Sequence, residues 1–367
     1  MIIHPKGSPS SRIWVIAETP FSTDKEKGYL FSGGAGYVFD KMMSDAGIKD
    51  YYVICRKPHL DDPSAASAYN IIENELNHYK PPFIIAMDSV GAFLCNELKM
   101  GKQQKTHSVQ LNKYVGSLLS AEQGFLNYPH YIMPVLSMQK YLGDWSERNI
   151  TAFFDFQKLR IEFEYWQARG VIQPLPKREL IYADLSFDAL ISRLDSLRDS
   201  LYLSVDIETC YPKADSAFRG HPGYPITIGI ASSPIYGLSF NLFRDSHTET
   251  LVLWRKLNEL LSSHSIIGQN FYNFDLYFLT SLGFQIDKTK IQDTLIRHHI
   301  LWPELPHKLQ FLTRQYTREP YYKDEGHGWN MKDMMKLRRY NALDVTITYE
   351  VFEQQELEFT ERKEIAA

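Results

Sequence analysis

LYLSVDIET, at residues 201–209, sets the architecture expected of the second half of the chain. Its first residues are apolar or favour extended backbone, which predicts a buried strand. Asp206 and Glu208 stand two residues apart at its end, so the two-residue period of a strand places both carboxylates on one face of the sheet. A single pair of this kind more often caps a helix or lies in a solvated turn. Its meaning therefore depends on acids elsewhere in the chain.

Two later segments supply those acids. QNFYNFD, at 269–275, places Asp275 after a predicted strand and at the start of a helix. YNALD, at 340–344, places Tyr340 and Asp344 four residues apart, on one face of a helix. Four carboxylates in one pocket would repel one another unless divalent cations neutralise them. Ligands that are all oxygens suit Mg²⁺ or Mn²⁺ better than Zn²⁺.

The segments around these acids predict the rest of the second half. SFDALISRLDSLRDS, before the strand, has the pattern of a helix. PITIGIA and YGLSFNLF, after it, predict two more strands that pair antiparallel. The remaining segments predict mainly helices, of which the longest is the last, near residues 331–362.

The first half of the chain alternates short apolar segments with helical stretches, which predicts a parallel α/β sheet. A helix over 151–169 closes this half, and Gly170 and Pro174 then break the pattern. We therefore expect two domains, 1–172 and 173–367. The strand candidates of the first domain are 12–17, 51–56, 82–87 and 130–136.

The overall composition excludes several classes of protein. With 44% hydrophobic and 23% charged residues, the chain is typical of a folded protein. A formal charge of −4 disfavours nonspecific coating of duplex DNA, so any nucleic-acid contact should be a local groove. The three cysteines lack CxxC spacing, which disfavours a disulfide framework and thiolate metal sites. Without an apolar membrane span or signal-peptide core, we expect no membrane partner and a cytoplasmic location, in a bacterial or phage-infected cell.

Together the three acid-bearing segments resemble the exonuclease motifs of the DEDD superfamily, in the subclass whose third motif carries tyrosine. The resemblance covers roughly residues 180–362. It implies a ribonuclease-H-like mixed sheet flanked by helices, and 3′→5′ hydrolysis that releases nucleoside 5′-monophosphates. It also implies two Mg²⁺ or Mn²⁺ ions held by the four acids. The implied catalytic residues are Asp206, Glu208, Asp275, Tyr340 and Asp344, and the implied substrate-binding residues are Asn270, Phe274 and Thr209.

The resemblance also assigns a role to each catalytic residue, following the two-metal mechanism. Asp206 would bridge both ions. Glu208 and Asp344 would hold the ion that binds the attacking water, and Asp275 would help to hold the other. Tyr340 would orient that water. Two neighbouring positions complete the comparison: Gln269 stands where family members often have His, and Asp293 resembles a structural Asp that begins a helix.

The choice of substrate rests on LTRQYTREPYYKDEG, residues 312–326. This segment resembles the proofreading domain of phage-type family A DNA polymerases, which implies a single-stranded or frayed DNA 3′ end as substrate. A polymerase would then be a partner or a domain that this chain lacks. Two alternatives stay open, an RNA 3′-trimming exonuclease of the ribonuclease D type and a noncatalytic DNA-binding accessory of a replisome.

The first domain carries a second resemblance, in IAETPFSTDKEKGYLFSGGAG followed by YYVICRKP. These segments resemble the opening of the family 4 uracil-DNA glycosylases. Glu18 matches the acid of their first motif, and Phe31 the aromatic that stacks on a flipped base. Tyr51 replaces the uracil-reading Asn and Ser137 replaces a catalytic His. We therefore expect the glycosylase fold without its chemistry, in a domain that contacts DNA or a partner.

Overall fold

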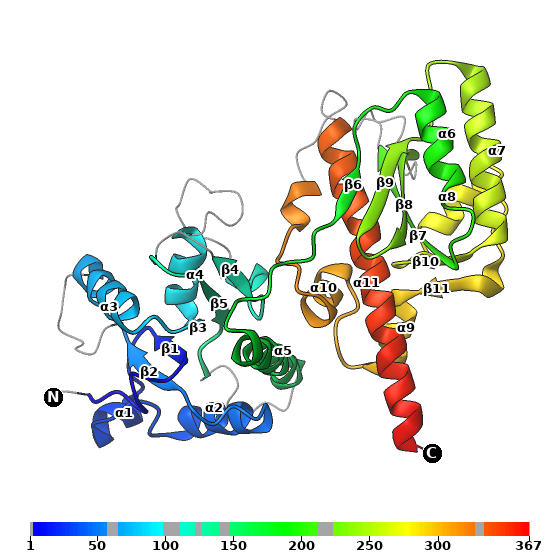
Figure 1. Cartoon of the computed structure of the whole chain (residues 1–367). Helices are drawn as coiled ribbons and strands as arrows, with labels where there is room; N and C mark the ends of the chain where they lie inside the picture. The colour runs from blue at the N-terminus through cyan, green and yellow to red at the C-terminus, as the bar shows by residue number, and fades with distance from the viewer. Residues whose placement is uncertain are drawn as a thin grey trace, which may run out of the picture. The chain divides into compact units, whose positions relative to one another are not determined.

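A computed structural model describes residues 3–56, 65–97, 111–121, 126–138, 147–210, 223–326 and 334–366. The chain divides into two compact units, Met1–Leu175 and Pro176–Ala367 (Figure 1). Each unit has its own sheet and its own hydrophobic core. The predicted fold class, an α/β protein of two domains, is confirmed. Within the described residues, no helix combines the length and the apolar character that a membrane crossing requires.

The first unit is built on a five-stranded sheet with the order β2-β1-β3-β5-β4. Four strands are parallel, as predicted, and β4 pairs antiparallel with β5. Every residue of β1, β3 and β5 is buried, which explains why their sequences are continuous apolar runs. The strands are β1 (Ile13–Ala17), β2 (Tyr52–Cys55), β3 (Phe83–Met87), β4 (Leu119–Ala121) and β5 (His130–Val135).

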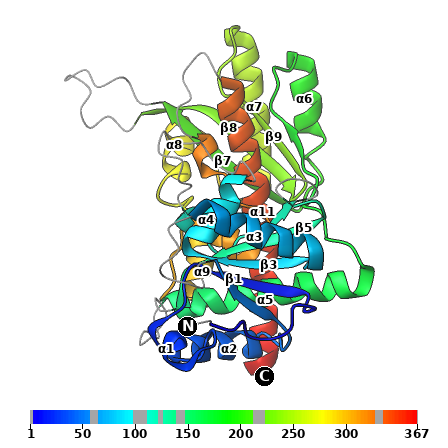
Figure 2. The ribbon, with the colours of Figure 1, turned by 90° about the vertical axis from the view of Figure 1, so that its left-hand side faces the viewer.

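Helices cover both faces of this sheet (Figures 1 and 2). Helices α2 and α5 lie on one face, where Phe39 and Phe156 pack edge to face within the core. Helices α3 and α4 lie on the other face, where Leu76 and Leu94 are buried. The helices are α1 (Ser22–Lys27), α2 (Gly34–Asp45), α3 (Ala65–Tyr79), α4 (Asp88–Glu97) and α5 (Glu147–Arg169).

The second unit is built on a six-stranded mixed sheet with the order β11-β10-β7-β8-β9-β6. Strands β7, β8 and β9 form an antiparallel meander, so the predicted pairing of PITIGIA with YGLSFNLF is confirmed. Strands β10 and β11 run parallel to β7. The strands are β6 (Glu179–Ile181), β7 (Tyr202–Cys210), β8 (Tyr224–Ser233), β9 (Tyr236–Asn241), β10 (Ser265–Gly268) and β11 (Ile291–Asp293).

The two faces of this sheet carry different helices (Figure 1). Leu203, Val205 and Ile207 of β7 join the core that includes residues of α6 and α7. Helix α11 crosses the opposite face, which is the face that carries Asp206 and Glu208. The helices are α6 (Phe187–Asp195), α7 (His247–Ser263), α8 (Asp275–Ser281), α9 (Thr294–Leu301), α10 (Leu309–Tyr316) and α11 (Met334–Ala366). The predicted start of the last helix, at 331, lies outside the described residues.

Two glycines let helix α11 lie directly on the sheet. A Cβ atom on Gly229 of β8 would lie 2.5 Å from Oδ1 of Asn341, and one on Gly237 of β9 would lie 2.6 Å from the carbonyl oxygen of Ala342. Real Cβ atoms do not approach other atoms this closely. The absence of side chains at both positions therefore brings the middle of α11, which holds Tyr340 and Asp344, against the acids of β7.

Candidate active site

Three of the predicted acids meet on the sheet face that α11 covers. Oxygen atoms from the carboxylates of Asp206, Glu208 and Asp344 all lie within 4.8 Å of one another. The first two side chains are half-buried and belong to β7. Asp344 comes from α11 and is only 5% exposed. The two-residue period of β7 and the packing of α11 on the sheet thus bring the three carboxylates together.

Asp275, the fourth predicted acid, lies at the border of this group. It begins α8 and is 2% exposed. Its Oδ1 atom accepts a hydrogen bond of 2.9 Å from the backbone N–H of Ile207, the residue between Asp206 and Glu208. Asp275 therefore contacts the strand that carries the first two acids, and its carboxylate is not one of the three that cluster within 4.8 Å.

Three of the four acids at the site have raised pKa values. Burial, followed by repulsion from Asp344, raises the pKa of Asp206 to about 7. Burial, followed by repulsion from Asp206 and Asp344, raises the pKa of Glu208 to about 9. The pKa of Asp275 is also raised well above its ordinary value, first by burial and then by Asp206. Cations bound here would replace protons that the acids otherwise retain.

Tyr340 lies one helical turn before Asp344, as predicted. Its hydroxyl accepts a hydrogen bond of 3.0 Å from Nζ of Lys323. Burial and then the charge of Asp344 raise the pKa of Tyr340. The side chain is therefore a neutral phenol at physiological pH and keeps a proton that it can donate.

Four residues around the site were not assigned a role from the sequence: Ser239, Tyr322, Lys323 and Asn341. Nδ2 of Asn341 donates to Oδ2 of Asp206 over 2.7 Å, while its own Oδ1 accepts from the hydroxyl of Ser239 over 2.7 Å. Tyr322 donates to Oδ1 of Asp344 over 2.5 Å. The sequence offered a partial signal, because Asn341 lies within the YNALD segment, and Tyr322 and Lys323 lie within the quoted segment 312–326.

Two of the predicted substrate-binding residues, Asn270 and Phe274, lie close to Asp275 in sequence, and contacts within the protein hold both of them. Asn270 has a positive φ of 58°, and its N–H donates to Oδ1 of Asp293 over 3.0 Å. Asp293 also accepts from the N–H groups of Tyr272 and Leu295, so all of these contacts are to backbone. Phe274 precedes α8 and packs edge to face on Phe278.

Thr209 and Gln269 lie beside the acid-bearing segments. Thr209 follows Glu208 where the pairing of β7 with β8 shifts register. The side chain of Gln269 donates to the carbonyl of His307 over 2.8 Å and accepts from the hydroxyl of Thr294 over 2.6 Å. The side chain of Gln269 therefore links the first residue of α9 to the segment before α10.

The two glycosylase-like residues of the first unit are both engaged within the protein. Glu18 follows β1 and accepts a hydrogen bond of 2.8 Å from Nε of Arg56, as well as one from the Ser89 hydroxyl. Phe31 is 4% exposed, and its ring stacks on that of Phe21 with centroids 5.7 Å apart. Little of the Phe31 ring is therefore accessible to a base.

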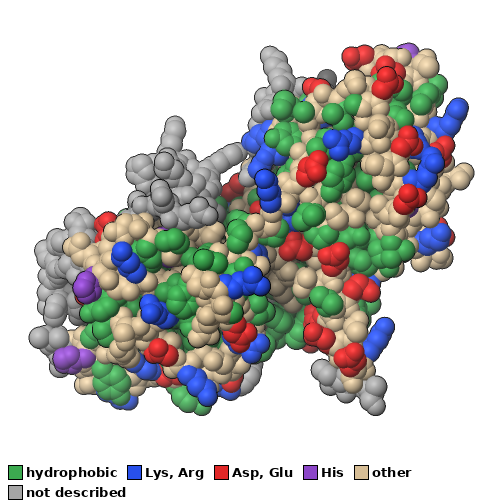
Figure 3. Space-filling model, viewed as in Figure 1, with side chains coloured by type: hydrophobic (Ala, Val, Ile, Leu, Met, Phe, Trp, Pro, Cys, Tyr) green, Lys and Arg blue, Asp and Glu red, His purple; other side chains and the backbone are tan. Residues whose placement is uncertain are grey.

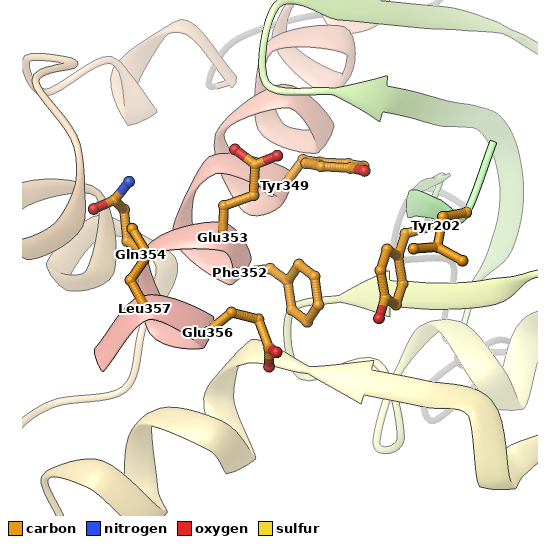
Figure 4. A pocket seen from close by; sticks show the side chains of 8 residues that line it. Tyr202, Tyr349, Phe352, Glu353, Gln354, Glu356 and Leu357 are labelled. Carbon is orange, nitrogen blue, oxygen red and sulfur yellow. The ribbon is translucent and has the colours of Figure 1, made fainter. Parts of the chain in front are cut away.

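The second unit also has a hollow of about 500 Å³ whose lining includes none of the candidate-site acids (Figure 4). The aromatic side chains of Tyr202, Tyr349 and Phe352 line it, together with the polar side chains of Glu353, Gln354 and Glu356 on α11. Tyr202 opens β7, whereas the acids lie toward its other end.

On the face shown in Figure 3, Lys and Arg side chains lie scattered among acidic and apolar ones.

Comparison with known proteins gives structural likenesses at low identity. No protein-family model and no curated protein matches the chain. The catalytic core of RRP6 from Trypanosoma brucei is 12% identical, with 53% of each chain covered and a TM-score of 0.35. The Nibbler EXO domain of Aedes aegypti is 14% identical, with 52% of this chain and 94% of that one covered and a TM-score of 0.40. Escherichia coli RNase D, an exoribonuclease involved in structured RNA processing, is 17% identical, with 49% and 46% covered and a TM-score of 0.33. The chain thus spans about half the length of the RRP6 core that it matches.

Proposed function

We propose that the second unit is a metal-dependent 3′→5′ exonuclease that acts on DNA ends. The observation that carries this proposal is the gathering of Asp206, Glu208 and Asp344 within 4.8 Å, with Asp275 hydrogen-bonded to the same strand. Packing alone gives no reason to hold several carboxylates together on a covered sheet face, because each is costly to desolvate and repels the others. Divalent cations remove both costs.

Carboxylate oxygens suit Mg²⁺ or Mn²⁺, and we propose that the site binds two such ions. Bound ions would stabilise charge on a phosphodiester and lower the pKa of a bound water. Asp206, Glu208 and Asp344 are the proposed direct ligands. Asp275, whose Oδ1 atom is engaged by the N–H of Ile207, is proposed to act partly through water.

The protein's own groups would orient the reactants around these ligands. Asn341, itself held by Ser239, fixes the plane of the Asp206 carboxylate. Tyr340 retains its proton and lies one turn from Asp344, so its hydroxyl can orient the attacking water by a hydrogen bond. This division of roles makes the tyrosine a positioning group for the water rather than a ligand.

We assign Asn270, Phe274 and Thr209 to contact with the substrate, since they lie within the acid-bearing segments. Bases at a single-stranded 3′ end would stack on apolar or aromatic side chains, which tolerates any sequence. The resemblance of residues 312–326 to phage-type proofreading domains supports DNA as substrate and a polymerase as partner. The first unit is proposed as a glycosylase-like domain without activity, because Glu18 is paired with Arg56 and Phe31 is covered by Phe21.

The decisive test is digestion of matched DNA, mismatched DNA, single-stranded DNA and RNA 3′ ends in the presence of Mg²⁺. We expect single-stranded and mismatched DNA ends to be trimmed fastest, because a matched end must first melt. Asp206→Ala and EDTA should each abolish the activity. Substantial nuclease activity in Asp206→Ala would refute the site, and faster trimming of RNA than of single-stranded DNA would reassign the enzyme to the ribonuclease D type.

A further inference from the structure

Lys323 forms an ion pair with Asp344, a carboxylate that the proposed function assigns to a metal ion. Its Nζ atom lies 2.8 Å from Oδ1 and 2.7 Å from Oδ2 of Asp344, so it contacts both oxygens. The same atom lies 3.0 Å from the hydroxyl of Tyr340. An ammonium group at this point has the charge sign and the oxygen contacts of a bound cation.

The surroundings hold the ammonium in place. Its charge lies 5.1 Å from the ring centre of Tyr322 and 5.0 Å from that of Tyr340, which permits cation–π attraction to both. Lys323 and Asp344 have side chains only 17% and 7% exposed, so water screens the pair weakly. Tyr322 adds a hydrogen bond of 2.5 Å to the same carboxylate. The attraction between the two charges is therefore screened less than in an exposed ion pair.

The charge of Lys323 also acts on the rest of the cluster. Carboxylate oxygens of Asp206 and Glu208 lie within 4.8 Å of one from Asp344, so the positive charge of Lys323 also attracts these two acids. The lysine is thus the cation that the described residues bring into contact with this acidic group. A divalent ion that binds Asp344 must take an oxygen that Lys323 now contacts.

We propose that Lys323 is a resident counter-ion that holds Asp344 when no metal is bound and is displaced when a divalent cation enters. The inference rests on the proposed function for the assignment of Asp344 as a metal ligand. Lys323 and the metal then compete for the same carboxylate, and the lysine weakens the first binding step. A lysine whose only role is to fasten residues 323–326 to α11 would keep its contact with Asp344 when metal binds.

The test measures Mn²⁺ affinity of the full chain without substrate, by titration of free Mn²⁺ in electron paramagnetic resonance. Lys323→Met keeps the length and packing of the side chain but removes its charge. We expect its dissociation constant for the first ion to be lower by about tenfold or more, because the positive charge that repels an entering cation at Asp344 is gone. Lys323→Arg, which keeps the charge, should stay near the wild-type affinity.

Lys256→Met is the matched control, since Lys256 pairs with Asp195 on the other face of the sheet and is 11% exposed. It should leave Mn²⁺ affinity unchanged. Lys323→Gln serves as a second neutral variant if Lys323→Met does not fold. An affinity in the neutral variants that is equal to or weaker than wild type would overturn the proposal.

A measurement on the wild-type protein gives an independent outcome. Amine-reactive labelling of Lys323, quantified by mass spectrometry, should increase severalfold when Mn²⁺ is added, while labelling of Lys256 stays constant. Unchanged or decreased labelling at Lys323 would also overturn the proposal. Tighter Mn²⁺ binding in Lys323→Met together with no nuclease activity in the wild type would refute the exonuclease and leave the competition intact. Nuclease activity with unchanged affinity would refute only the competition.

Discussion

Replacing Asn341 by alanine should reduce both the stability of the domain and the metal affinity of the site, without removing any carboxylate. Asn341 is fully buried, and its Nδ2 atom donates to Oδ2 of Asp206 over 2.7 Å. The substitution also removes the acceptor of the Ser239 hydroxyl, whose residue is 1% exposed. Loss of the hydrogen bond to Asp206 costs roughly 0.5–1.5 kcal/mol where that carboxyl is protonated and roughly 1.5–3 kcal/mol where it is ionised, and an unsatisfied buried hydroxyl costs roughly 1–3 kcal/mol.

The expected consequence is both a less stable domain and a looser metal site. Because the two costs share one side chain and are not additive, we expect the free energy of unfolding to fall by about 2–4 kcal/mol. Loss of a residue that orients a metal ligand typically reduces metal affinity or activity by about 10- to 100-fold, so Asn341→Ala should show an effect of that size. Mn²⁺ titration and single-turnover cleavage of single-stranded DNA measure the two effects separately from stability.

Thr346→Ala provides the matched control for this prediction. Thr346 is fully buried in the same helix, and its hydroxyl bonds only to the carbonyl of Leu343 within the described structure. This variant should lose stability and retain metal affinity. If Asn341→Ala behaves in the same way, the amide serves packing alone, and the argument that it orients Asp206 is wrong.

Three further predictions concern the hydroxyl, the acids and the first unit. Tyr340→Phe should lower the single-turnover rate by roughly 10²-fold with Mn²⁺ affinity nearly unchanged, since one positioning hydrogen bond is lost; an unchanged rate would show that another group orients the water. Without metal, the free energy of unfolding should decrease as the pH rises, because the folded protein favours the protonated forms of Asp206 and Glu208. The decrease should run from pH 3.8 to about 7 for Asp206 and from pH 4.5 to about 9 for Glu208. Denaturant titrations in EDTA should show this decline, and saturating Mg²⁺ should remove most of it; equal pH dependence with and without Mg²⁺ would contradict the assignment. In an Asp206→Ala background the chain should form no abasic sites on uracil-containing duplex DNA, and their appearance would show that the first unit is an active glycosylase.

The parts of the site that follow local geometry could be predicted from the sequence. The pairing of Asp206 with Glu208 needs only the two-residue period of β7, and that of Tyr340 with Asp344 needs only one turn of α11. The order of the segments then indicated that both pairs converge. The four parallel strands of the first unit could also be predicted from the sequence, because burial on both faces produces continuous apolar runs.

The parts that depend on contacts between distant segments could not be predicted in this way. The three-residue strands β4, β6 and β11 are too short to show a period. The contact of Lys323 with Asp344 arises because Lys323–Gly326 packs on α11, and no spacing in the sequence encodes it. Asp275 shows a further limit, since an acid that opens a helix has the same sequence signature whether it binds metal or a backbone N–H.

The charge balance of the site connects these separate observations. Three clustered carboxylates and Asp275 need positive charge: burial and mutual repulsion raise the pKa values of Asp206 and Glu208, which favours protonation, and Lys323 pairs with Asp344. Both responses are reversible, because protons dissociate and a lysine side chain has rotatable bonds. A site whose only purpose was stability would gain more from apolar side chains than from this arrangement. The acids are therefore best explained by an exchange of these two substitutes for divalent cations during the hydrolysis that we propose.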